Sequence, residues 1–104
     1  MTDKDIEQQI QAKGKNAPRV TLADIEANIK STEIVKHVAA SGQVLRWAVL
    51  TTQSGFAVTG KPSCAVSPEN DDAELGARFA VDNAKEEMWA LMGYALKQKL
   101  SEAN

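Results

Sequence analysis

Residues 44–60 read VLRWAVLTTQSGFAVTG, and this stretch decides the fold. Residues 44–52 are rich in β-branched and aromatic side chains, which favour strands. Residues 53–55, Gln-Ser-Gly, are typical of a tight turn, because glycine readily takes the positive φ that such a turn needs. A second short strand-forming run, FAVTG, follows the turn. The stretch therefore predicts an antiparallel β-hairpin over residues 43–60.

Alternation along this hairpin divides the side chains of its first strand between two faces. One face carries Leu45, Trp47 and Val49, and the other carries Val44, Arg46, Ala48 and Leu50. A hairpin alone is unstable in water, so one of these faces must pack against a helix.

The helix that covers it is expected in the C-terminal part of the chain. Residues 67–72, SPENDD, fit a helix start with Ser67 as the cap, Pro68 in the first turn and carboxylates near the positive end of the macrodipole. We expect a long helix from Pro68 or Asp71 to Leu100. Within it, small residues spaced four apart form a seam that lets a neighbouring backbone approach closely; they are Gly76, Ala80 and Ala84.

Two short helices are predicted in the N-terminal part. Thr2 with Asp5 three residues later fits a capping box before a helix that ends at Gly14, and Thr21 with Asp24 fits a second one, before a helix running to about Lys30. Residues 32–40 fit either a strand or a helix.

These elements predict an α+β fold: short N-terminal helices, an antiparallel β-hairpin or three-stranded meander, and a long C-terminal helix packed on the sheet. The 104 residues suit a single small domain, with residues 1–16 as a loosely docked helix. Only one face of this sheet has a helix to cover it. We therefore expect a second copy of the chain to close the remaining apolar surface, as a homodimer.

Charge and hydropathy narrow the classes of function. Twelve Lys and Arg against 14 Asp and Glu give a net charge of −2, which disfavours sequence-independent binding to nucleic acid. Direct nucleic-acid binding is not expected. No apolar run is long enough for a membrane helix, the N-terminus is unlike a signal peptide, and the single Cys64 suits a reducing compartment. A cytosolic location is the expectation.

Several segments together resemble a known family. They are residues 56–60 (FAVTG), 67–76 (SPENDDAELG) and 89–94 (WALMGY), with Asn83-Ala84, residues 17–21 (APRVT) and residues 24–26 (DIE). The chain is similar to the gene-49/gene-66 family of small proteins from N4-like and Sf6-like tailed phages. Members usually carry an aromatic residue where this chain has Asp71, and often a proline at the position of Ala90; the absence of that proline favours an unbroken final helix. The resemblance implies a phage or prophage origin and a small accessory protein in the host cytoplasm. It implies no activity and no site residues.

The residues give no assembled reaction centre, so we expect no enzyme, cofactor or metal. Gly55, Gly60 and Lys61 match part of a phosphate-loop pattern, but the intervening residues form a predicted strand and Pro62 replaces the required hydroxyl residue. His37 is the single histidine and lacks ligand spacing. Nothing in the sequence places it beside Cys64 as the base of a thiol nucleophile, which leaves a Cys64 enzyme as the weakest hypothesis.

Two groups of residues are candidates for contact with a partner. The acidic run Glu69, Asp71, Asp72 and Glu74 fits either a solvated helix start or a docking patch for a basic partner. Trp47, Trp89 and Tyr94 fit either core positions or anchors of an interface.

The leading hypothesis is a non-enzymatic phage or prophage accessory protein that binds and modulates or inhibits a host protein, in host takeover or counter-defence. One alternative is an oligomeric sponge that sequesters a nucleotide-like signal molecule through basic residues; these would be Arg19, Arg46, Lys61 and Arg78. Another is a phage structural or assembly accessory.

Overall fold

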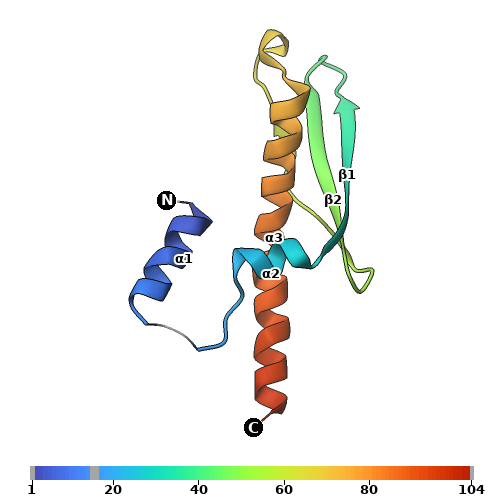
Figure 1. The fold of residues 1–104 in the computed structure, drawn as a ribbon. Helices are drawn as coiled ribbons and strands as arrows, with labels where there is room; N and C mark the ends of the chain where they lie inside the picture. The colour runs from blue at the N-terminus through green and yellow to red at the C-terminus, as the bar shows by residue number, and fades with distance from the viewer. Residues whose placement is uncertain (1, 15–16, 104) are drawn as a thin grey trace.

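The computed structural model describes residues 2–14 and 17–103 and has the expected α+β architecture (Figure 1). A long C-terminal helix lies across one face of a small antiparallel sheet. In chain order the elements are α1 (Asp3–Ala12), α2 (Leu22–Ala27), β1 (Ile29–Val38), β2 (Val44–Thr52), β3 (Ala57–Thr59), β4 (Ser63–Cys64), the 3-10 turn η1 (Pro68–Asn70) and α3 (Ala73–Glu102).

Strand β2 is the centre of the sheet. It pairs with β1 over its whole length on one edge, and with β3 and the two-residue β4 on the other. The predicted hairpin is confirmed, since β2 turns into β3 at residues 53–56 and Gly55 has a φ of 94°. The residues between Gly55 and Gly60 include strand β3, as the sequence predicts, and Lys61 follows this strand.

Residues 29–38 form a strand, which resolves the open choice for residues 32–40. The prediction that the second helix continues to Lys30 is wrong, because α2 ends at Ala27 and β1 begins at Ile29. Pairing with all of β2 satisfies the backbone groups along one edge of β1 and outweighs a further helical turn. The side chain and carbonyl of Asn28 accept hydrogen bonds from the amide of Gln53, which fixes this reversal of the chain.

The start of the long helix also differs from the prediction. Ser67 makes no side-chain cap hydrogen bond, and Pro68 begins the separate turn η1. Helix α3 begins at Ala73, where Asp72 Oδ1 accepts hydrogen bonds from the amides of Glu74 and Leu75, both at 3.0 Å. The helix is interrupted before this point because Asp71 is extended, with a ψ of 128°, and engages Arg46 on the sheet. From Ala73 the helix runs unbroken to Glu102, as the absence of a proline predicts.

The face of β2 that meets α3 carries Arg46, Ala48, Leu50 and Thr52, all buried. Ala80 and Ala84 are fully buried against it, which confirms the small-residue seam. The backbone reaches the helix at Gly60, where an added Cβ would lie 2.3 Å from the Ala84 nitrogen.

The N-terminal part forms a peripheral layer. Both predicted capping boxes are present, at Thr2 and at Thr21. Helix α1 has no buried residue and stands apart from the sheet (Figure 1), with an ion pair between its Glu7 and Arg19. The described molecule is elongated, with extents of 54 × 31 × 18 Å, and the C-terminal half of α3 extends beyond the sheet.

Candidate functional site

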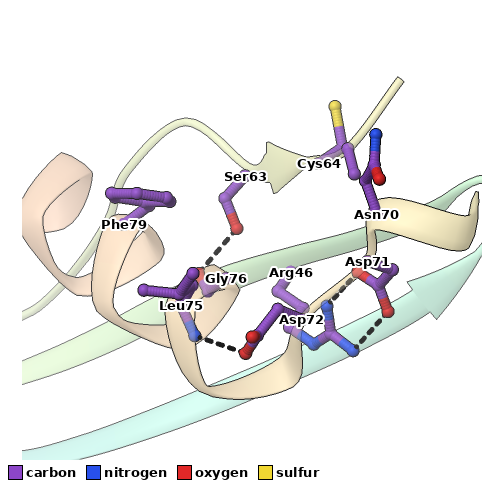
Figure 2. Close-up of a pocket in the computed structure, with 10 residues that line it drawn as sticks. Arg46, Ser63, Cys64, Asn70, Asp71, Asp72, Leu75, Gly76 and Phe79 are labelled. Carbon is purple, nitrogen blue, oxygen red and sulfur yellow. Dashed lines mark hydrogen bonds and ion pairs between the residues drawn. The ribbon is translucent and has the colours of Figure 1, made fainter. Parts of the chain in front are cut away.

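A small pocket lies where η1, β4 and the first turns of α3 meet above β2 (Figure 2). Its cavity measures about 110 Å³. Polar groups from separate parts of the chain form its base, and apolar side chains of α3 form one wall. Its lining includes Arg46, Ser63, Asp71, Asp72, Leu75 and Phe79.

Arg46 is the buried charge at the base of this pocket. It lies on the α3-facing side of β2 and is 6% exposed. Its Nη1 and Nη2 donate to the two carboxylate oxygens of Asp71 at 2.6 and 3.0 Å. This two-point geometry is the strong form of an arginine–carboxylate pair, and it ties the loop before α3 to the centre of the sheet.

A close approach and a hydrogen bond, both at Gly76, place the start of α3 over the arginine. An added Cβ at Gly76 would lie 3.1 Å from Arg46 Nη1, so glycine gives the guanidinium its room beneath the first turn. Ser63 Oγ donates to the carbonyl of Gly76 at 2.6 Å and joins β4 to α3.

The charges around Asp71 favour its ionised form. The hydrogen bonds from Arg46 lower the pKa of Asp71, desolvation opposes this shift, and the positive charges of Arg46 and Lys36 add to it. The pKa of Arg46 is raised, first by the hydrogen bond to Asp71 and then by the charges of Asp71 and Asp72, against desolvation. The pair is therefore fully charged at neutral pH and forms a fixed part of the fold.

Two exposed apolar side chains of α3 lie beside this polar base. Leu75 and Phe79 are one helical turn apart, line the pocket and are 44% and 57% exposed. Adjacent exposed apolar side chains bordered by polar groups are typical of interaction sites. The pocket thus has a charged, internally neutralised base and an apolar rim.

The structure divides the predicted acidic run into two pairs. Asp71 and Asp72 serve the fold, the first through Arg46 and the second as the cap of α3. The side chains of Glu69 and Glu74 are exposed and make no hydrogen bond or ion pair within residues 2–14 and 17–103. They are therefore the two acids of the run that remain available to a partner.

The predicted aromatic candidates are not gathered at this pocket. Trp47 lies on the face of the sheet away from α3. Trp89 packs against the buried core and lines a second cavity, beneath α1. Tyr94 is 73% exposed on the C-terminal half of α3. The three side chains occupy three separate places.

The basic residues of the sponge hypothesis are separated too. Arg46 and Arg19 are each paired with a carboxylate of the same chain, and they line different pockets, at the start of α3 and beside α2. Lys61 lies on the loop after β3 and Arg78 on α3, and both are exposed.

Cys64 and His37 flank Leu45 on the same side of the sheet, because both are paired with that residue. Two strand spacings place them about 10 Å apart, too far for a hydrogen bond between thiol and imidazole. Within the part of the chain that the structure describes, no group of three His, Cys, Asp or Glu residues is arranged to hold a metal ion.

Sequence reasoning missed the partnership at the base of the pocket. Arg46 stands out within an apolar strand, and its position on the Ala48 and Leu50 face is the signal that it points toward the covering helix. Its partner, 25 residues away, could not be chosen among the four acids of residues 69–74. Ser63, Leu75 and Phe79 give no comparable signal.

Comparison with known proteins identifies one family. Residues 20–100 match the model described as phage protein (N4 Gp49/phage Sf6 gene 66) family. No curated protein and no solved structure matches the chain. None of the helices in residues 2–14 and 17–103 has the length and apolar character that crossing a bilayer requires.

Proposed function

The chain belongs to the phage protein (N4 Gp49/phage Sf6 gene 66) family, and we propose that it is a non-enzymatic accessory protein that binds a host protein in the cytoplasm and modulates or inhibits it. The observation that carries this proposal is the pocket at the start of α3. Its charged base is occupied by the chain's own Asp71, while its rim exposes Leu75 and Phe79.

The pocket suits contact better than chemistry. Arg46 is held at two points by Asp71, so an anionic substrate would have to displace an intramolecular partner. A cavity of about 110 Å³ lies below the range of about 300–1,000 Å³ typical of sites for small molecules. An apolar side chain of a partner protein fits a hollow of this size at the centre of an interface.

The charges near the pocket indicate the character of that partner. Glu69 and Glu74 project from the segment that enters α3, and both are exposed. Unpaired acids beside an apolar rim favour a partner with basic groups around an apolar anchor. Such charges steer the encounter, and the buried apolar contact supplies most of the affinity.

Capture from host lysate tests the proposal. The wild-type chain should retain a saturable host protein, and Phe79→Ser combined with Glu69→Lys and Glu74→Lys should lose it. The matched control is Tyr94→Ser combined with Glu87→Lys and Glu102→Lys, which removes an exposed aromatic and reverses two exposed charges on α3 outside the pocket. The control should bind as the wild type does. Equal capture by both variants, or no saturable capture by the wild type, would contradict the proposal.

A further inference from the structure

The face of the sheet away from α3, called here the open face, is apolar at its centre. Leu45, Trp47 and Val49 project from β2 on this side, and Val35 of β1 lies opposite Trp47 in the register. None of these residues belongs to the buried core or packs against it. They are only partly buried, and no described helix covers them.

This composition is unsuited to water. An antiparallel sheet with one solvated face normally alternates apolar and polar residues, with the polar set outward. On β2 the outward set begins Leu, Trp, Val, in the middle of the sheet. Polar residues flank this centre on the neighbouring strands and at one end of β2; in the register, Glu33 and Thr59 lie opposite Val49, His37 lies opposite Leu45, and Ser31 lies opposite Thr51. An apolar centre with a polar rim is the anatomy of a protein interface.

The exposed area of the whole chain indicates how much surface a partner has to cover. Residues of the 11.2 kDa chain expose 7332 Å², whereas a compact monomer of this mass exposes about 5,700 Å². The excess, about 1,600 Å², is twice the roughly 800 Å² per partner that a standard interface buries. The protruding α1 and the end of α3 account for part of the excess, and the partly exposed side chains of the open face contribute to it as well.

We propose that the open face binds the open face of a second copy of this chain. A two-fold axis near Trp47 would stack the two sheets about 10 Å apart, with both α3 helices on the outside. Such an arrangement places two tryptophans at the middle of the interface, where binding energy concentrates. It leaves the pocket at the start of α3 on the outer side of each copy, so the dimer does not depend on the proposed host contact.

Sedimentation equilibrium of the full chain over the micromolar range tests the dimer. The wild type should approach twice the 11.2 kDa chain mass as concentration rises. Val49→Lys places a charge in the centre of the open face and should weaken association at least about thirtyfold. Val35→Lys makes the same change on the edge strand, where the fold tolerates it better. Phe56→Lys is the matched control, because Phe56 is 58% exposed in the turn between β2 and β3.

The possible outcomes show whether a second copy of the chain or a different protein covers the open face. Dimers of the wild type and of Phe56→Lys, with folded monomers of Val35→Lys or Val49→Lys by circular dichroism, would support the proposal. A wild type that stays at the monomer mass throughout would overturn it and would leave the face to a different protein. Dimers that persist equally in both open-face variants would overturn it as well, because they would form through another surface.

Trp47 fluorescence adds a measurement that locates the contact. In a Trp89→Phe background Trp47 is the single tryptophan. Its emission should shift to shorter wavelength as concentration rises through the range in which the mass doubles. A doubling of mass with unchanged Trp47 emission would place the interface elsewhere and overturn the proposal.

Discussion

Gly60 is the position at which a single methyl group should do most harm. An added Cβ would lie 2.3 Å from the Ala84 nitrogen and 2.4 Å from the Asn83 carbonyl carbon, both backbone atoms of α3. Since a helix backbone cannot move aside as a flexible side chain can, Gly60→Ala should force β3 and α3 apart. We expect a loss of about 3 kcal/mol or more in the free energy of unfolding, measured by urea denaturation.

Gly93→Ala is the matched control for this prediction. Gly93 lies within α3, and an added Cβ there meets nothing within 4 Å. The same change should raise the free energy of unfolding by up to about 1 kcal/mol, because alanine has the higher helix propensity. Similar losses in the two variants would contradict the close approach at Gly60.

Asp71→Asn tests the charged pair through its pH dependence. The pKa of Asp71 is lowered in the folded protein, so the pair's contribution to stability is complete above the ordinary pKa of about 3.9. It is lost as the pH falls through the lower folded-state pKa, where the wild-type carboxyl itself becomes neutral. The difference in unfolding free energy between wild type and Asp71→Asn should therefore be constant near neutrality and shrink in acid.

Glu69→Gln is the control for that pH series. It neutralises an exposed acid two positions away that makes no ion pair with the described residues. We expect almost no difference from the wild type at any pH. A difference for Asp71→Asn that grows toward acid would show that Arg46 does not hold this carboxylate in its ionised form.

At the scale of one element, the N-cap of α3 observed in the structure, Asp72, can be compared by mutation with the N-cap predicted from the sequence, Ser67. Asp72 Oδ1 accepts two backbone hydrogen bonds at the start of the helix, whereas Ser67 makes no such bond. Asp72→Ala should lower the free energy of unfolding by about 1 kcal/mol, and Ser67→Ala should leave it almost unchanged. Thermal or urea unfolding of the two variants measures this, and the reverse order would contradict the observed helix start.

The elements that could be predicted from sequence are those decided by nearby residues. The hairpin turn at Gly55 and the capping boxes at Thr2 and Thr21 each depend on a spacing of a few residues. The predicted helix boundaries are wrong where contacts between residues far apart in the sequence determine the structure. Helix α2 stops at Ala27 because β1 pairs with β2, and α3 starts late because Asp71 reaches Arg46, 25 positions away.

The same distinction applies to the candidate site. The acidic run was visible in the sequence, but its division into structural and free acids depends on where Arg46 lies in the fold. Leu75 and Phe79 are apolar residues four positions apart in a helix, a spacing that suits a buried helix face as well as an exposed one. Their exposure follows from the narrowness of the sheet, which ends at the two-residue strand β4 beneath them. The sequence alone does not indicate how wide the sheet is beneath these residues.

At the scale of the whole molecule, the shape is more extended than the length of the chain requires. The radius of gyration is 16.6 Å, against about 13 Å for a compact domain of this size. Among the described residues, six fully buried hydrophobic side chains hold α2, β2 and α3 together, and α1 lies outside that cluster. Stability should therefore be concentrated in the sheet and α3.

Deletion of residues 1–14 tests this distribution. Helix α1 contributes Ile6, which is 42% exposed, a partly buried Ile10 and the half-buried ion pair between Glu7 and Arg19, which is worth about 0–1 kcal/mol. We expect the shortened chain to keep one cooperative unfolding transition, with a loss of no more than about 2 kcal/mol. In a Trp47→Phe background, the emission of Trp89 should shift to longer wavelength, because α1 covers the cavity beside it. Loss of cooperative unfolding would instead make α1 part of the core on which the other elements depend.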